Sequence, residues 1–232
     1  MMLALSVALS VPLCLLLLLV DDRRTKFYLA LFAWGGLAGF FAAEINQYAT
    51  GTFDISLQAL QIQFAPIAEE AIKAIPLFGL FFFARQYVRS REIIIGAIFI
   101  GFGFSVVENF WYMLQQPGMT TTELLIYVLT RSVSTTIMHG FATGTIGFTL
   151  YYLSRGTVDA FGFRLVYPIM GYSFAVMGHA LFNLIVQFQE LGRVVAVAGA
   201  LSVYVSAWMF VELVYRDLPD GETAWENPTH TE

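Results

Sequence analysis

Residues 65–73 read Ala-Pro-Ile-Ala-Glu-Glu-Ala-Ile-Lys, and they place three charged side chains inside an apolar run over residues 64–84. A charged residue at the centre of a membrane-spanning helix costs roughly 2.5–3.5 kcal/mol on insertion scales. Because Glu69, Glu70 and Lys73 lie so close together, they must face something other than lipid. The stretch therefore predicts a buried polar site on a membrane helix.

The spacing of these residues indicates how they share the helix. At about 100° per residue, Lys73 lies angularly between Glu69 and Glu70, and it follows Glu69 at the favourable i,i+4 spacing. One ammonium neutralises only one of two carboxylates, so the second is left for a proton, a metal ion or a water molecule. Such a carboxylate is suited to act as a general base. A structural ion pair and a proton-coupled transport site are the alternatives.

Composition places the whole chain in a membrane. Its 232 residues are 58% hydrophobic and only 12% charged, which is far from the average of soluble proteins in both respects. We expect a multi-pass protein of the cell membrane that is embedded in the lipid bilayer and has no nucleic-acid partner. The single cysteine, Cys14, excludes an internal disulfide and a metal centre built from several cysteines.

The hydropathy pattern predicts an all-α fold with about seven transmembrane helices. Residues 124–153 would form a helix about 45 Å long, so this region must tilt, bend or begin with an extra interfacial helix. Thr120 and Glu123 form a possible capping box before it. We expect one membrane domain over residues 1–216 and an acidic, disordered tail over residues 217–232. The predicted spans cover residues 1–20, 27–48, 63–84, 93–114, the part of 124–153 from residue 133, 165–188 and 194–215.

Loop charges predict the orientation of these spans. In the seven-span arrangement nine basic residues fall on one side of the membrane, and only Arg193 falls in a loop on the other. By the positive-inside rule, the N-terminus lies outside the cell and the C-terminal tail lies in the cytoplasm. The nine residues are Arg23, Arg24, Lys26, Arg85, Arg89, Arg91, Arg155, Arg164 and Arg216.

Polar residues also interrupt the fourth, fifth and sixth predicted spans. In each of these spans one carboxylate or histidine lies about 9–13 Å from the outer end, at 1.5 Å per residue, as Glu69 does in the third. The shared depth predicts one polar chamber in the outer half of the bilayer. Taken singly, each residue has a structural alternative, such as a hydrogen bond between helices or, for Glu108, an ion pair with Arg131. The residues are Glu108, Asn109, His139, His179 and Asn183.

Three chemistries can use this set of residues. In the first, Glu69 or Glu70 activates water for hydrolysis, and His139, His179 and Asn183 hold the tetrahedral oxyanion. In the second, zinc is bound by the two histidines and either Glu70 or Glu108, although no HExxH-type spacing is present. In the third, the titratable groups relay protons in a transporter. The chain shows no matched pair of interrupted helices and no two-fold repeat, which disfavours transport.

Four motifs, taken in order, resemble the PrsW family of prokaryotic intramembrane proteases and, more distantly, the CAAX-processing and bacteriocin-immunity protease superfamily. The resemblance covers residues 27–190 and implies cleavage of a single-span membrane protein, such as an anti-sigma factor, near the outer face of the cell membrane. The motifs are Glu69-Glu70-x-x-Lys73, Gly103-Phe104-x-x-x-Glu108-Asn109, His139, and His179-x-x-x-Asn183.

The resemblance does not decide whether the reaction requires a metal ion. PrsW-family members are often described as metalloproteases, whereas the distant relatives are treated as metal-independent glutamate proteases. The residues favour the metal-independent version, so we expect no cofactor, with zinc as the alternative. A proton-coupled transporter and a non-catalytic membrane scaffold are the rival functions.

The predicted catalytic arrangement has Glu69 and Glu70 at its centre, one as the base and the other orienting it, and the sequence does not decide which is which. Lys73 is expected to hold one of them ionised. The histidines and Asn183 would position water and the oxyanion, and Glu108 and Asn109 would support the site.

Overall fold

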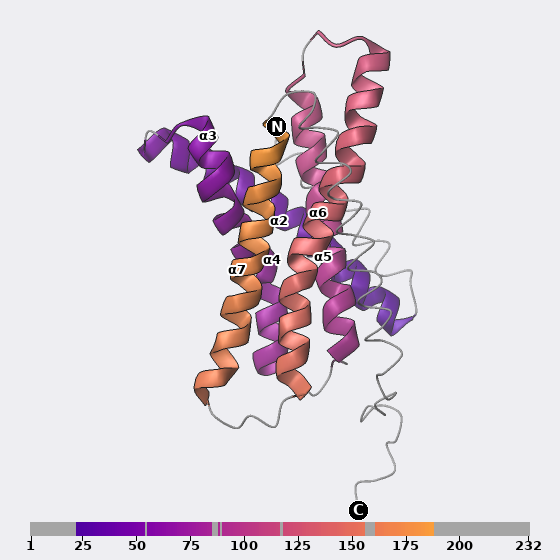
Figure 1. Ribbon diagram of the computed structural model, residues 1–232. Helices are drawn as coiled ribbons and strands as arrows, with labels where there is room; N and C mark the ends of the chain where they lie inside the picture. The colour runs from indigo at the N-terminus through magenta and orange to yellow at the C-terminus, as the bar shows by residue number, and fades with distance from the viewer. Residues whose placement is uncertain are drawn as a thin grey trace, which may run out of the picture.

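Every element that the structure describes is helical. The computed structural model describes residues 22–53, 55–84, 88, 90–116, 118–155 and 161–187. These ranges contain no strand, which confirms the predicted all-α class. The elements are α2 (Arg23–Phe53), α3 (Leu57–Ala59), the π-helical turn η1 (Leu60–Phe64), α4 (Ala65–Phe83), α5 (Ser90–Leu114), α6 (Thr121–Arg155) and α7 (Phe161–Val186) (Figure 1).

Three of the described helices are long and apolar enough to cross a membrane, namely Arg23–Phe53, Glu92–Leu114 and Val166–Val186. The predicted first span, the seventh span and the acidic tail lie outside the described residues. The count of seven spans and the domain boundary at residue 216 therefore stay predictions.

The helices form a bundle in which α4 contacts each of the other long helices. Helices α4 to α7 stand side by side, and α2 runs obliquely across them (Figure 1). Helix α5 packs against α2 and α6, α6 packs against α7, and α4 contacts both α2 and α7. Apolar side chains from these helices form one buried cluster, which includes Leu31, Leu77, Ile100, Ile146 and Leu150. Helices α4 and α6 end, and α5 and α7 begin, at the opposite end of the bundle from the α5–α6 connection (Figure 1).

Two glycines of α5 allow its backbone to approach the neighbouring helices. A Cβ atom added to Gly103 would overlap the backbone of Phe32 in α2. A Cβ atom added to Gly101 would overlap the backbone carbonyl of His139 in α6. Small residues permit such close contacts between membrane helices. The contact at Gly101 fixes where His139 stands relative to α5.

A proline at the start of α4 is compensated by a side chain from α7. Pro66 has no N–H group, so it cannot donate to the carbonyl of Gln61, five residues earlier in the π-helical turn. The side-chain amide of Asn183 donates to this carbonyl at 2.9 Å. Because an unpaired carbonyl is costly inside a membrane, this bond ties the start of α4 to α7.

A second proline, inside α4, is compensated from the other side. Pro76 removes the N–H group that would normally donate to the carbonyl of Ile72. The indole Nε1 of Trp34 in α2 donates to this carbonyl at 3.2 Å. Helix α4 is therefore held by hydrogen bonds to α7 before its charged cluster and to α2 beside it.

Helix α6 accommodates the long fifth apolar region as one continuous helix of 35 residues, about 52 Å in length. The predicted capping box at its start is present. The backbone N–H and the hydroxyl of Thr120 both donate to the Glu123 carboxylate, and the Glu123 N–H donates to the Thr120 hydroxyl. Donation by the Thr120 backbone and hydroxyl lowers the pKa of Glu123. The apolar residues Leu125, Ile126 and Leu129 in the first turns are exposed.

The close contact at Gly101 predicts that even a small side chain at this position destabilises the protein. Gly101→Ala places a methyl group against the carbonyl of His139, so the two helices must separate. We expect the free energy of unfolding to fall by about 1–3 kcal/mol, as for other overpacked cores. Unfolding of the purified protein in detergent micelles, followed by circular dichroism, measures this change.

Gly79→Ala is the matched control, because a Cβ atom at Gly79 in α4 would meet no atom within 4 Å. Alanine is the better helix former, so this variant should be as stable as the parent or more stable. Equal losses in the two variants would contradict a close contact specific to Gly101.

Candidate active site

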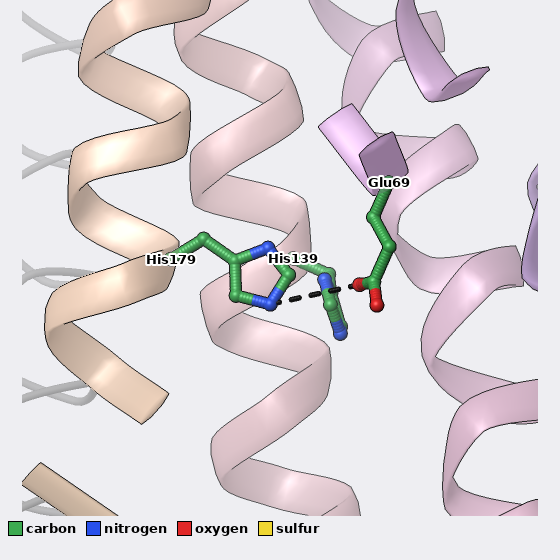
Figure 2. A group of neighbouring side chains, drawn as sticks. All are labelled: Glu69, His139 and His179. Atoms are coloured by element: carbon green, nitrogen blue, oxygen red, sulfur yellow. Dashed lines mark ion pairs between the residues drawn. The ribbon is translucent and has the colours of Figure 1, made fainter. Parts of the chain in front are cut away.

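The predicted polar residues converge from four helices. Helix α4 contributes Glu69, Glu70 and Lys73, while α5 contributes Glu108, α6 contributes His139 and α7 contributes His179. The α4 cluster and both histidines are buried. Figure 2 shows Glu69, His139 and His179 pointing toward one another from three helices. The shared depth inferred from the sequence thus corresponds to one cluster in space.

Glu70 is the most highly connected carboxylate of the cluster. Its Oε1 atom accepts from Lys73 Nζ at 2.5 Å and from His179 Nδ1 at 2.9 Å. Its Oε2 atom accepts from the hydroxyl of Thr143 at 3.3 Å. Lys73 therefore pairs with Glu70 at i,i+3, and both side chains have no exposed surface. With both oxygens bound, Glu70 is placed to orient its partners.

Glu69 differs from Glu70 because one of its oxygens is free. The Oε1 atom accepts from the side-chain amide of Asn46 in α2 at 3.2 Å. The buried Oε2 atom has no hydrogen-bond partner. It lies 3.7 Å from Nε2 of His179, within ion-pair distance if the histidine is protonated, and this nitrogen is also buried and has no hydrogen bond (Figure 2).

Glu69 Oε2 and His179 Nε2 face each other, and both can act as hydrogen-bond acceptors. His179 donates its Nδ1–H to the Glu70 carboxylate, so in the neutral form of the ring the lone pair lies on Nε2. That lone pair faces the free oxygen of Glu69, and neither atom of this pair has a hydrogen to donate. Two buried acceptors at this distance require a proton, a water molecule or a cation between them.

His139 is held on both sides of its ring. Its Nε2 lies 3.1 Å from Glu108 Oε2, and its Nδ1 lies 3.0 Å from Lys73 Nζ. An ionised carboxylate only accepts, so the neutral ring carries its hydrogen on Nε2 and its lone pair on Nδ1. The other oxygen of Glu108 pairs with Arg131 at 3.3 Å, and the Arg131 guanidinium stacks on the ring of Tyr112. The predicted alternative, an ion pair between Glu108 and Arg131, is therefore present together with the histidine contact.

The donor set of the site fits a zinc ion. Glu69, His139 and His179 each offer one ligand atom, and these atoms lie within 4.8 Å of one another. Two histidines and one carboxylate are a common ligand set of catalytic zinc. A carboxylate also binds the second nitrogen of each histidine, as is typical around metal ligands. The partnerless atoms of Glu69 and His179 support the same conclusion.

The comparison with protein families decides the identity of the chain. The model of the PrsW family of intramembrane metalloproteases matches residues 23–214. The chain belongs to the PrsW family. It is therefore an intramembrane protease, a peptide hydrolase of the membrane, as the motifs predicted. No curated protein and no solved structure gives a significant match.

The cluster changes one detail of the predicted zinc site. The sequence suggested Glu70 or Glu108 as the carboxylate that joins the two histidines. Among the described residues, the group that could hold a metal ion instead contains Glu69 beside the two histidines, while Glu70 and Glu108 are each bound to a histidine and a cation. The i,i+4 spacing suggested Glu69 as the neighbour of Lys73, whereas the ion pair in the structure joins Lys73 to Glu70.

The two asparagines of the motifs lie around the site. Asn109 Oδ1 accepts from the hydroxyl of Thr135 at 2.8 Å, which joins α5 to α6. Asn183 donates to the Gln61 carbonyl and so supports the backbone that precedes Glu69. The predicted role of Asn183 as an oxyanion donor stays a prediction.

Two residues of the site were missed from the sequence. Thr143 stands four residues after His139 on the same face of α6, and this spacing could have identified it. Asn46 is a polar residue near the end of a long apolar helix, where a partner on another helix is expected. No local pattern indicated that this partner is Glu69.

The unequal contacts of the two adjacent glutamates predict unequal effects on stability. Glu70→Gln removes the carboxylate that neutralises buried Lys73, and we expect a loss of about 3–5 kcal/mol in the free energy of unfolding. Glu69→Gln removes one hydrogen-bond acceptor of a side chain with a free oxygen, and we expect a change within about 1 kcal/mol. Denaturant unfolding in micelles measures both. Similar losses would show that Glu69 also supports the fold.

Proposed function

We propose that this PrsW-family protease is a metal-dependent endopeptidase whose reacting carboxylate is Glu69. The observation that carries the proposal is the pair of buried, partnerless acceptors formed by Glu69 Oε2 and His179 Nε2. Glu69, His139 and His179 would hold a zinc ion. When bound, zinc polarises the scissile carbonyl and lowers the pKa of a bound water toward neutral.

The surrounding side chains prepare these three residues. Glu70 keeps the hydrogen of His179 on Nδ1, so the Nε2 lone pair faces the site. Glu108 does the same for His139 by accepting from its Nε2–H. Asn46 holds one oxygen of Glu69 and leaves the other available. The ligand atoms are thus oriented before a substrate arrives, which is the arrangement that catalysis requires.

In the metal-independent mechanism predicted from the sequence, Glu69 would be the base that accepts the proton of the attacking water. Glu70 is neutralised by Lys73, and Glu108 is neutralised by Arg131, so neither is suited to accept a proton. The Glu69 carboxylate pairs with no lysine or arginine in the described part of the chain. In the metal-dependent version, which the family description and the ligand cluster favour, the free oxygen of Glu69 would instead hold the metal ion.

We further propose seven spans with the N-terminus outside, and a site open to the outer face. Glu69, Glu108 and His179 stand about 6–11 Å along their helices from the ends on the side of the α5–α6 connection. Helices α4 and α6 end at the other end of the bundle, and the chain segments that follow them in the sequence are among the predicted basic loops. Such loops face the cytoplasm by the positive-inside rule. The substrate would be a single-span membrane protein, for example an anti-sigma factor of a prokaryotic cell, cut near its outer end.

Replacement of Glu69 tests the reacting carboxylate. Glu69→Gln should lower cleavage of a single-span substrate in proteoliposomes by about a thousandfold or more, because the reacting oxygen becomes part of an amide. Gel analysis of the cleaved substrate measures the rate. Glu44→Gln is the control, since Glu44 is an exposed carboxylate of the neighbouring helix α2 and should leave the rate unchanged.

Removal of metal tests the zinc site in the same assay. Chelation should abolish cleavage by the parent protein, and zinc should restore it. Full activity in a preparation shown to be metal-free would instead establish the metal-independent mechanism with Glu69 as the base. Normal cleavage by Glu69→Gln would exclude both versions.

Cysteine labelling tests the orientation. In a Cys14→Ala background, Met119→Cys in the α5–α6 connection should react with an impermeant thiol reagent added outside intact cells. Thr25→Cys at the start of α2 should react only after the membrane is opened, because it lies with the basic residues. The reverse labelling pattern would place the site on the cytoplasmic side.

A further inference from the structure

Lys73 makes a contact that its pairing with Glu70 does not explain. Its ammonium, which has no exposed surface, lies 3.0 Å from Nδ1 of His139 as well as 2.5 Å from Glu70 Oε1. It also lies 4.2 Å from the centroid of the Phe104 ring. A lysine needed only to neutralise Glu70 would not have to approach a histidine.

The nitrogen that Lys73 contacts is the one suited to a metal. Glu108 accepts the hydrogen on Nε2 of His139, so Nδ1 carries the only lone pair of the neutral ring. A lone pair binds either an ammonium hydrogen or a metal ion, and it cannot bind both. Among the described residues, no ammonium or guanidinium group competes for His179, because its Nε2 atom has no hydrogen bond and lies near only the Glu69 carboxylate.

We propose that the Lys73 ammonium is an internal competitor of the metal, which occupies His139 until a metal ion displaces it. The proposal rests on the metal site of the proposed function and adds a role for a residue that binds no metal itself. In the metal-free protein Lys73 supplies the positive charge that the buried carboxylates require. When metal binds, Lys73 keeps its bond to Glu70 and gives up the one to His139.

Two physical effects then lower the affinity for metal. The bond between Lys73 and His139 must be broken, and the displaced ammonium remains close to the incoming dication, which it repels. Lys73 therefore weakens metal binding although it supports the fold of the metal-free site. Residues that surround metal ligands commonly change metal affinity by about 10–100-fold. Here we expect the opposite of the usual loss: removal of the Lys73 side chain should make metal binding tighter.

Zinc affinity of the full-length protein in micelles tests the proposal without measuring proteolysis. Competition with a chromophoric chelator should give a zinc dissociation constant at least about tenfold lower for Lys73→Met than for the parent. Zinc should also raise the unfolding temperature of Lys73→Met by more than it raises that of the parent. Unchanged or weaker binding would overturn the proposal and leave Lys73 as a counter-ion of Glu70.

A matched variant separates competition for His139 from the general effect of a positive charge on metal binding. Arg131→Met removes the same charge from the same cluster, where Arg131 pairs with Glu108, but leaves Lys73 on His139. It should change zinc affinity much less than Lys73→Met does. Equal strengthening in the two variants would refute competition for His139. If Lys73→Met does not fold without zinc, Lys73→Gln, which still donates to Glu70, is measured instead with the same expectation.

A third variant distinguishes failure of this inference from failure of the proposed function. His179→Ala removes a ligand of the proposed site and should abolish stoichiometric zinc binding. If the parent binds no more zinc than His179→Ala, the metal site itself is wrong. If His179→Ala loses zinc but Lys73→Met gains no affinity, only the role of Lys73 is wrong.

Discussion

The buried ion pair of Glu70 and Lys73 is the interaction on which the rest of the structure depends. Both side chains have no exposed surface, and they lie in the middle of an apolar bundle. A charge in such a place is tolerated only when it is paired and its remaining lone pairs are bound. Helix α4 must therefore be surrounded by helices that supply hydrogen-bond donors. These donors are Thr143 from α6 and His179 from α7.

The backbone around this pair is adapted to the same constraint. Two prolines of α4 remove hydrogen bonds on either side of the charged cluster, and side chains of α7 and α2 replace them. Inside a membrane no water is present to make up the loss, so these bonds fix the rotation of α4 about its axis. That rotation decides that Glu70 faces α6 and α7, while Glu69 faces Asn46 of α2 and the edge of His179.

Three carboxylates of one cluster acquire different functions through their neighbours. Glu70 and Glu108 each accept from a histidine and pair with a cation, so each of them orients a histidine ring. Glu69 has a neutral amide on one oxygen and no hydrogen bond on the other. The proposed chemistry of the site thus rests on one residue that lacks a hydrogen bond, while its neighbours have partners on both oxygens.

The sequence by itself determined the helical class, the membrane setting, the family and the residues that gather at the site. These features depend on local patterns, namely apolar runs of spanning length, charges that lipid excludes and motifs at fixed spacing. The capping box of Thr120 and Glu123 is local in the same way and was also predicted. Only the tertiary structure decided which glutamate keeps a free oxygen, which one pairs with Lys73, and that Lys73 also reaches His139. Adjacent glutamates look alike in sequence, and they differ here because of how whole helices are rotated and how closely they approach. Contacts between residues far apart in the sequence, such as Gly101 and His139, fix that approach.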